Sequence, residues 1–292
     1  MTLAPRVVVV HRSTELDELL AQHGTRGQAA FFLSTRGRRI EDLEERHAGN
    51  RAALTAVSAA IPLDWRRGLV ERDDLARFLF APDDLIVVVG QDGLVANVAK
   101  YLDGQPVIGI NTDPARNPGV LVRHQPRDAA ELLHAVADVE ERVMVEAATD
   151  DGQSLRALNE IYLGHPSHQT ARYTLSLPGL QPEPQASSGL IVATGTGATG
   201  WCRSIWLERH SELALPAPEE ALLAWFVREA WPSPATGTSL TEGVLGAASL
   251  TVGVDSEHLV AFGDGIEADH LSLSRGQRVT IGRSARTLRL VR

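Results

Sequence analysis

The turn Gly90-Gln91-Asp92-Gly93 combines residue types that suit phosphate chemistry. It follows the apolar run Leu85–Val89 and precedes the apolar segment Leu94–Leu102, so we expect it to join a buried strand to a helix. Glycines in such a turn let the backbone approach a phosphate, whose charge the N–H groups at the helix start stabilise. An aspartate there can orient a hydroxyl nucleophile, accept its proton or hold Mg²⁺. Taken alone the motif is short, and a glycine-aspartate turn without catalysis is the simpler interpretation.

A second polar motif, Asn159-Glu160, lies inside the strand-like stretch Leu155–Leu163. Adjacent residues on a strand point to opposite faces, so we expect one of the pair to line a cleft unless a bulge turns both inward. An asparagine and a glutamate together suit ribose hydroxyls or adenine edges, because they offer both donors and acceptors. A solvated strand end explains the same two residues without any ligand.

The stretch Ser187–Trp201 runs from a buried strand into a turn rich in glycine and threonine, and then into a helix. Threonine hydroxyls and exposed backbone amides suit nucleotide recognition, and an aromatic ring at the start of a helix, here Trp201, can stack on a base. An ordinary turn with a helix cap accounts for much of the same pattern. The motif therefore indicates a nucleotide site only in combination with others.

Alternating strand and helix patterns fill the first 125 residues. The β-branched run Arg6–Val10 predicts a buried strand, Ile40–Ile61 a long amphipathic helix, and Pro106–Ile110 a further strand. Strand, glycine turn, helix and strand form a βαβ unit, which is parallel and right-handed. Such sheets bind ligands at the carboxyl ends of their strands, where the glycine turn and Asn111-Thr112-Asp113-Pro114 both fall.

After a helix expected at Arg127–Val136, the pattern changes to short alternating segments separated by Pro, Gly and Ser clusters such as Leu177–Pro184. We therefore predict an α/β protein, with a Rossmann-like parallel α/β domain at residues 1–125 and a β-rich, sandwich-like domain at residues 126–292. The segment Leu222–Ala230 is compatible with either a helix or a strand.

Composition narrows the functional classes. The 292 residues carry a net charge of −9, which argues against bulk nucleic-acid binding and against an anionic membrane surface. No run approaches the roughly 18 apolar residues of a membrane span, and no signal peptide is expected. The single cysteine, Cys202, excludes an intrachain disulfide, and no metal site is assigned, since the pair His165 and His168 lacks a third ligand. We expect a cytoplasmic protein.

Four motifs, in this order and spacing, resemble those of the NAD kinases: Gly90–Gly93, Val107–Pro114, Asn159-Glu160 and Thr194–Trp201. The form Ile-Asn-Thr-Asp-Pro, and Ser-Ser-Gly-Leu followed by Thr-Gly-Thr-Gly, is more similar to the mitochondrial type than to the common bacterial type. The resemblance extends from about Arg6 to Asp264-Gly265. Four ordered motifs are far more specific than any one of them.

The resemblance implies an enzyme that transfers a phosphoryl group from ATP, or from inorganic polyphosphate, to the adenosine-ribose 2′-hydroxyl of NAD or NADH. The products are NADP or NADPH, and Mg²⁺ takes part. The resemblance places the active site in the cleft between the two domains. It also implies a homo-oligomer, a dimer or tetramer, whose sites are partly completed across the interface. Small-molecule nucleotides are the expected partners; nucleic acid and membranes are not.

The resemblance also gives each motif residue a role. Asp92 would activate or orient the 2′-hydroxyl, and the turn around it would bind phosphate and nucleotide through Gly90, Gln91 and Gly93. The residues implied to bind substrate are Asn111, Thr112, Asp113, Asn159, Glu160, Thr196, Thr199 and Trp201. Of these, the asparagine-glutamate pair would hold the dinucleotide, the two later threonines would meet its adenine side, and the tryptophan stands at the position of a family aromatic residue.

The sequence departs from the family's motifs in two places. Gln91 stands where the family has glycine. In the threonine-rich element, Ala198, Gly200 and Trp201 replace commoner residues, and Ala198 removes a hydroxyl. Two further functions therefore stay open: a degenerate relative that binds a dinucleotide as a sensor without turnover, and a lipid or sugar kinase of the same superfold. Asn159-Glu160 and the Thr194–Trp201 element argue against the second. Asp264-Gly265, which also matches a family turn, is interpreted as structural.

Overall fold

The computed structural model describes residues 4–167 and 169–292, and the chain divides into two compact units. The first comprises the chain up to Glu140 together with Arg289–Arg292, and the second comprises Glu141–Leu288. The first unit extends past the boundary expected after residue 125, because the helical segment that follows packs on its core. The last residues belong to it because the end of β16 (Arg278–Val291) pairs with β4 (Pro106–Asn111).

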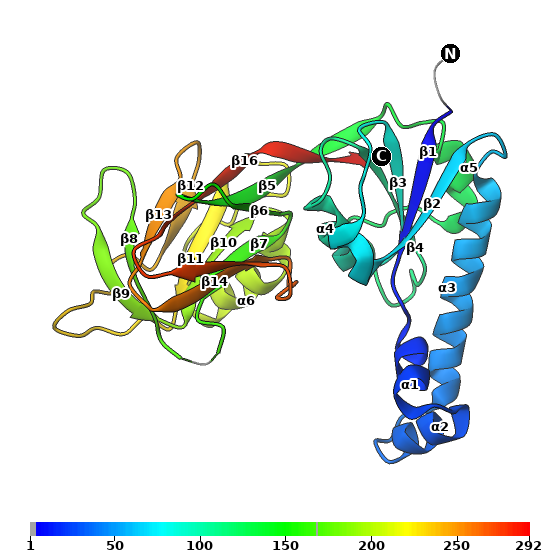
Figure 1. Ribbon diagram of the computed structural model, residues 1–292, viewed down its shortest axis with the longest axis horizontal. Coiled ribbons are helices and arrows are strands. Elements are labelled where there is room, and N and C mark those ends of the chain that lie inside the picture. The colour runs from blue at the N-terminus through cyan, green and yellow to red at the C-terminus, as the bar shows by residue number, and fades with distance from the viewer. Residues whose placement is uncertain (1–3, 168) are drawn as a thin grey trace. The chain divides into compact units, whose positions relative to one another are not determined.

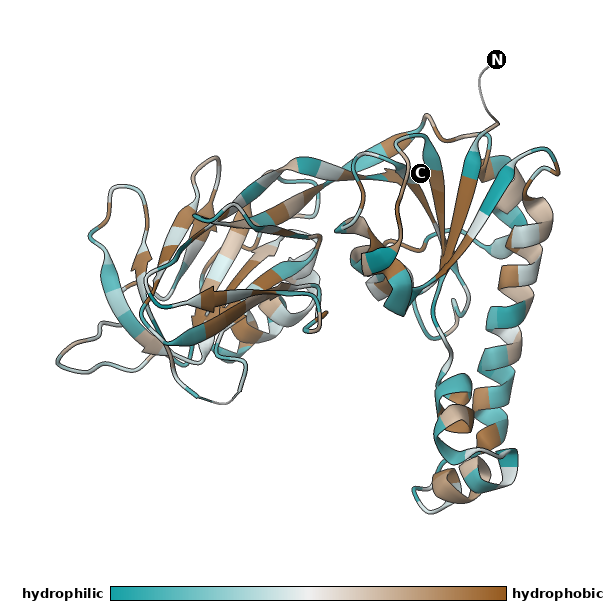
Figure 2. Ribbon diagram, in the orientation of Figure 1, coloured by the Kyte–Doolittle hydropathy of each residue, from teal (hydrophilic) through white to brown (hydrophobic). Residues whose placement is uncertain are grey.

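A parallel sheet forms the centre of the first unit (Figure 1). Its strands stand in the order β2 (Arg66–Glu71), β1 (Arg6–His11), β3 (Asp84–Gly90) and β4. The three inner strands are rich in valine and isoleucine, which suit a sheet covered on both faces (Figure 2). The predicted βαβ unit is confirmed, and β3 and β4 end at the same edge of the sheet because Gly90 pairs with Asn111.

Helices cover both faces of this sheet. α3 (Ile40–Ala60) and α5 (Ala129–Leu132) share one core with alternate strand residues, while α4 (Asp92–Ala99) packs against β1, β3 and β4. The 3₁₀ turns η1 (Arg72–Arg77) and η2 (Pro126–Asp128) contact α4 and α3 respectively. The helix predicted at 40–61 is confirmed, whereas the one predicted at 127–136 is shorter and divides into η2 and α5.

A helical arm packs on the first half of α3 (Figure 1). α1 (Glu15–His23) begins at Thr14, which forms a capping box with Asp17, and α2 (Arg26–Ser34) follows directly. The arm has a small core of its own, made by Leu16, Leu19, Ala29, Leu33, Ile40 and Leu43. The first half of α3 therefore buries its apolar stripe in the arm, and the second half buries it on the sheet.

Short strands make up most of the second unit. They are β5 (Val139–Thr149), β6 (Ser154–Ala157), β7 (Glu160–Gly164), β8 (Ala171–Ser176), β9 (Glu183–Ser187), β10 (Gly189–Thr194), β11 (Leu223–Arg228), β12 (Glu242–Leu245), β13 (Leu250–Val254), β14 (His258–Gly263), β15 (His270–Ser274) and most of β16. The turn η3 (Gly197–Thr199) and the helix α6 (Trp201–Glu208) follow β10. The segment 222–230, which was ambiguous in the sequence, forms the strand β11.

These strands form a sandwich. One sheet has the antiparallel order β12-β11-β10-β7-β14-β15, and the other places β16, β13, β8 and β9 side by side, with β5 and β6 paired beside β16. Apolar residues from both sheets, among them Tyr173 and Trp225, form one core, and α6 covers the opposite face of the first sheet through Cys202 and Ile205. The predicted β-rich second domain is confirmed. Within the described residues, no helix is long and apolar enough to span a membrane.

Candidate functional site

The Gly90–Gly93 turn joins β3 to α4 with an ordinary backbone. Gln91 is the N-cap residue of α4, with φ −123° and ψ 165°, an extended conformation that any residue adopts. Its side chain is exposed and makes no capping hydrogen bond, and an added Cβ at Gly93 would meet open space. The geometry of this turn therefore accepts glutamine at position 91.

The Asp92 carboxylate is held by the backbone of a neighbouring loop. Its Oδ2 accepts the N–H of Val120 at 2.9 Å, and its Oδ1 accepts those of Leu121 and Val122 at 2.8 and 2.9 Å. A carboxylate offers about four lone-pair positions, so one position on Oδ2 is left over. The three N–H groups fix the orientation of the carboxylate, and the remaining position can accept a hydroxyl.

The Asn111–Asp113 segment lies beside this turn. The Asn111 side chain is buried and forms its hydrogen bonds within its own loop. Its Nδ2 donates to the Asn117 carbonyl at 2.9 Å, and its Oδ1 accepts the Asp113 N–H at 3.0 Å. Thr112 and Asp113 are half-buried, and the Asp113 carboxylate pairs with Arg116 at 3.2 Å. The first unit thus brings the two predicted turns together, with Asn111 shaping the loop and its two neighbours partly exposed.

The predicted strand 155–163 is interrupted at Leu158 and Asn159, which separate β6 from β7. The Asp264 carboxylate accepts the N–H groups of both residues, at 2.9 and 2.7 Å. From the other side, Thr194 donates its hydroxyl to the Leu158 carbonyl at 2.6 Å and its N–H to the Asn159 carbonyl at 2.9 Å. The strict alternation expected for Asn159 and Glu160 therefore does not apply, and both side chains are half-buried.

Glu160 has an unusual electrostatic environment. Burial, together with the nearby negative charge of Asp264, raises the pKa of Glu160 to about 8. No hydrogen bond to its carboxyl is found within the described residues. Cys202 of α6 lies near it, and burial, followed by the charge of Glu160, raises the pKa of the Cys202 thiol to about 12. At neutral pH the site therefore presents a protonated carboxyl and an inert thiol.

The turn after β10 is packed against two other backbone segments. An added Cβ at Gly195 would collide with the Ala217 carbonyl, and one at Gly197 with the Asn159 carbonyl, so both positions require glycine. The hydroxyl of Thr196 is buried and has no hydrogen-bond partner in the described part of the chain. Thr199 donates its hydroxyl to the Thr196 carbonyl at 2.9 Å. The unpartnered Thr196 hydroxyl is a candidate ligand contact.

Trp201 belongs to an aromatic cluster. Its ring stacks on Tyr162 with 5.7 Å between centroids, and Arg228 lies over it at 5.3 Å. Tyr162 also contacts Phe262 at 5.0 Å. Tyr162 and Arg228 are not recognisable as site residues in the sequence, because no local pattern joins them to Trp201. Asp264 stands in a recognisable Asp-Gly turn, but its contact with Asn159 is not predictable from the sequence.

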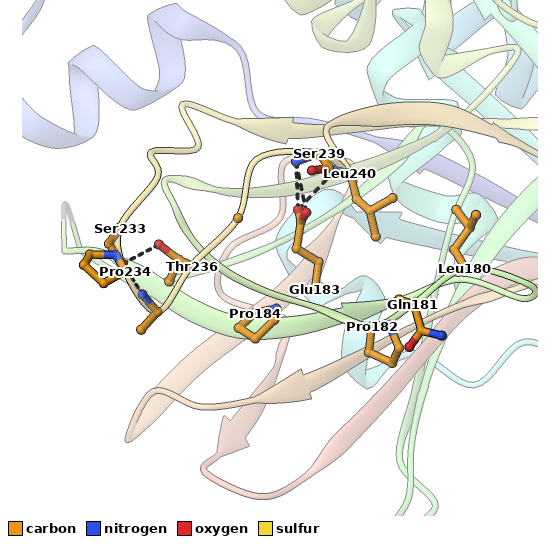
Figure 3. A pocket seen from close by; sticks show the side chains of 12 residues that line it. Leu180, Gln181, Pro182, Glu183, Pro184, Ser233, Pro234, Thr236, Ser239 and Leu240 are labelled. Atoms are coloured by element: carbon orange, nitrogen blue, oxygen red, sulfur yellow. Dashed lines mark hydrogen bonds between the residues drawn. The ribbon is translucent and has the colours of Figure 1, made fainter.

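The second unit contains a pocket of about 510 Å³ (Figure 3). The segments 180–184 and 233–240 line it, and none of the predicted site residues does. The Glu183 carboxylate accepts the N–H groups of Ser239 and Leu240, which ties the two segments together. Among the described residues, no group of three His, Cys, Asp or Glu side chains is placed to hold a metal ion, and His168 lies outside these residues.

Comparisons with known proteins identify relatives, although no family model matches the chain. The NAD kinase of Methylococcus capsulatus is 35% identical over 133 residues, which cover 41% of this chain and 44% of that protein. The NAD kinase of Bordetella avium is 30% identical, covering 53% and 59%, and the mitochondrial NAD kinase 2 of Rattus norvegicus is 29% identical, covering 48% and 43%. The chain thus spans about half the length of the curated relatives it matches.

A solved structure extends the likeness to the whole fold. The crystal structure of an NAD kinase from Archaeoglobus fulgidus in complex with ATP covers 98% of this chain and 93% of that one, with a TM-score of 0.58 and 20% identity. Bacterial and mitochondrial NAD kinases both match the sequence, and the greater similarity to the mitochondrial type stays a prediction from the motifs. The chain is therefore similar to NAD kinases in sequence over about half of its length, and it shares the fold of a solved NAD kinase.

Proposed function

We propose that the protein is an NAD kinase, which transfers a phosphoryl group from ATP or inorganic polyphosphate to the adenosine-ribose 2′-hydroxyl of NAD or NADH. The observation that supports this most strongly is the Asp92 carboxylate, which three backbone N–H groups hold at the carboxyl end of β3 with one acceptor position free. Parallel sheets bind their ligands at this end. The similarity to NAD kinases is the reason for proposing NAD as the substrate.

In the proposed reaction, the 2′-hydroxyl donates to the free position on Asp92 Oδ2, which orients its oxygen toward the terminal phosphorus. The new oxygen–phosphorus bond forms as the bond from phosphorus to the bridging oxygen breaks. The remainder of the donor leaves with the electron pair of the broken bond, and the hydroxyl proton passes to the Asp92 carboxylate. Gly90, Gln91 and Gly93 would bind phosphate through the backbone around the start of α4.

The resemblance to NAD kinases gives dinucleotide-binding roles to five residues of the second unit: Asn159, Glu160, Thr196, Thr199 and Trp201. The buried, unpartnered Thr196 hydroxyl supports this role, because a ligand would supply the hydrogen bond it lacks. In the first unit, Asn111, Thr112 and Asp113 would line the crevice beside the Asp92 turn.

Mg²⁺ belongs to the proposal as a cation that reaches the site with the phosphates of the donor. Mg²⁺ usually keeps several waters and takes one or two carboxylates besides substrate phosphates, so no cage of three protein ligands is needed. Asp113, in the turn beside Asp92, is the carboxylate that would hold it, because the open position on Asp92 Oδ2 is given to the 2′-hydroxyl. When bound, it neutralises charge on the phosphates.

The oligomer and the compartment are also proposals. A homodimer or homotetramer is what the resemblance to NAD kinases implies, and light scattering of the purified protein measures it. A cytoplasmic location rests on composition alone, with a net charge of −9 and one cysteine. Both statements are independent of the chemistry at Asp92.

The test is incubation of the purified protein with NAD, Mg²⁺ and either ATP or polyphosphate, followed by measurement of NADP with an NADP-specific dehydrogenase. Asp92→Asn is compared with Asp74→Asn, which changes an exposed aspartate paired with Arg77. We expect NADP from at least one donor, loss of it in Asp92→Asn, and no change in Asp74→Asn. Calorimetric NAD binding without NADP formation would instead support the sensor, and absence of both would contradict any dinucleotide function.

A further inference from the structure

Asp264 adopts a backbone conformation that few residues other than glycine accept. Its φ is +53°, that of Gly265 is +68°, and the Ile266 N–H donates to the Gly263 carbonyl at 3.1 Å across the turn. Aspartate and asparagine enter this left-handed region more readily than other non-glycine residues, and an Asp-Gly pair is typical of such a turn. The turn aims the Asp264 side chain at the break between β6 and β7.

The contacts of Asp264 cover three consecutive residues. Its carboxylate accepts the N–H groups of Leu158 and Asn159, and its own N–H donates to the Glu160 carbonyl at 3.1 Å. Thr194 holds the carbonyls of Leu158 and Asn159 from the opposite side. The Asn159-Glu160 motif therefore has a backbone fixed between two elements, and only its side chains are left to meet a ligand.

The two carboxyl groups at this turn have unequal environments. Asp264 receives two N–H groups that stabilise its negative charge, whereas the Glu160 carboxyl receives none within the described residues. Besides burial, the charge of Asp264, from the turn after β14, acts on Glu160. Cys202, from α6, lies near Glu160, and its thiol stays neutral because burial raises its pKa to about 12. Two neighbouring carboxyls do not both ionise easily, so Asp264 keeps the charge and Glu160 keeps the proton.

We propose that Asp264 is a positioning residue for the proposed NAD kinase reaction: it fixes the Asn159-Glu160 backbone and makes Glu160 a neutral hydrogen-bond donor toward the dinucleotide. This rests on the proposed function, since it takes the ligand to be a dinucleotide. A protonated carboxyl donates to an oxygen or nitrogen of the ligand and adds no repulsion to its pyrophosphate. An ionised Glu160 could not donate a hydrogen bond to the ligand and would repel its pyrophosphate.

The proposal predicts how binding depends on pH. Burial and the charge of Asp264 raise the pKa of Glu160 to about 8, so the donor form is present below that pH and is lost above it. If the acid form binds, the dissociation constant for NAD is constant at lower pH and rises toward about tenfold per pH unit above the inflection. If Asp264 were purely structural, replacing it by asparagine would leave the inflection at the same pH.

The experiment is calorimetric titration of the full chain with NAD, without a phosphoryl donor, at several pH values from about 6.5 to about 9.5. Four proteins are compared with the wild type: Glu160→Gln, Asp264→Asn, the double variant, and Asp151→Asn. Asp151 is a matched control, because it also precedes a glycine of positive φ in the second unit and accepts a hydrogen bond from Gln153. Asparagine suits the backbone of residue 264, and circular dichroism checks that each variant is folded.

We expect the wild type and Asp151→Asn to show the same loss of affinity above about pH 8. Glu160→Gln keeps a neutral side chain at every pH, so its profile is flat, and so is that of the double variant. Asp264→Asn removes the neighbouring charge, so its loss of affinity begins at lower pH. If Asp264→Asn does not fold, the comparison of wild type with Glu160→Gln decides.

A flat wild-type profile, an inflection that persists in Glu160→Gln, an inflection at the same pH in a folded Asp264→Asn, or an absence of NAD binding overturns the inference. The outcome is separable from that of the proposed function, because no turnover is measured. If the protein binds NAD with this profile but makes no NADP, the inference about Asp264 and Glu160 stands and the proposed kinase activity is refuted. If it makes NADP while binding NAD independently of pH, the kinase activity stands and the inference is refuted.

Discussion

Asp92→Asn should loosen the loop at residues 120–122 as well as abolish phosphoryl transfer. The wild-type carboxylate accepts three backbone N–H groups, but an asparagine has one acceptor oxygen and an NH₂ group that would oppose the third N–H. Placing that oxygen where Oδ1 stands keeps Leu121 and Val122 bonded more weakly, without the charge. Val120 is 44% exposed, so water satisfies its N–H in part. The free energy of unfolding of the first unit should fall by roughly 2–3 kcal/mol.

That loss corresponds to a melting temperature lower by about 5–10 °C for a unit of this size. Hydrogen exchange read by mass spectrometry gives the local effect, since amides 120–122 should exchange about 30-fold faster or more in the variant. Asp74→Asn, which breaks only an exposed pair with Arg77, should leave both readouts unchanged. Unchanged exchange at 120–122 in Asp92→Asn, with NADP formation retained, would refute the reasoning about this carboxylate.

Three other substitutions test separate parts of the account. Gln91→Gly should change the free energy of unfolding by no more than about 1 kcal/mol and the rate of NADP formation by no more than about threefold. The reason is that the Gln91 side chain is exposed and its backbone conformation needs no glycine. A large gain in rate would mean that the glutamine obstructs phosphate binding. Burial opposes ionisation of Glu183, but hydrogen bonds from Gln185, Leu240 and Ser239 outweigh it and hold its pKa below the ordinary range. Glu183→Gln should therefore lower the melting temperature at pH 7, and the difference should vanish once the pH falls below that lowered pKa, whereas a difference persisting in acid would exclude the charge as its cause. Leu33→Ala, in the core of the helical arm, should lower the free energy of unfolding by about 2–5 kcal/mol and expose the arm to proteolysis. Phe31→Ala changes a side chain that is 72% exposed and should do neither. Equal effects of the two variants would contradict the existence of a packed core in the arm.

The elements around the motifs were predictable because their patterns are local. The runs at 6–10 and 85–89 are apolar enough to require a sheet covered on both faces, and the turn residues follow immediately. The domain boundary was less accessible. The apolar side chains of residues 126–140 predict a helix but not the domain that it packs on, and only the packing of Ala129, Leu132 and Leu133 on the first core places the segment there.

The contacts that hold the candidate site residues were not predictable, because they join distant parts of the chain. The Asp92 carboxylate bonds to N–H groups 28 to 30 residues later, and the Asp264 carboxylate to N–H groups 105 and 106 residues earlier. Hydrophobic periodicity carries no information about such pairs. The interruption of the strand at 158–159 has the same origin, since a local reading of Leu155–Leu163 gives one continuous strand.

The central claim is that a phosphoryl group passes from a donor to NAD, and following a labelled phosphate tests it most directly. ATP labelled in its terminal phosphate is incubated with NAD, Mg²⁺ and the wild type or Asp92→Asn, and the products are separated and identified; labelled polyphosphate is tested in parallel. The account predicts label in NADP as a 2′-phosphomonoester with the wild type and none with the variant. Label found only in inorganic phosphate or remaining in both donors, at NAD concentrations that saturate binding, would contradict it.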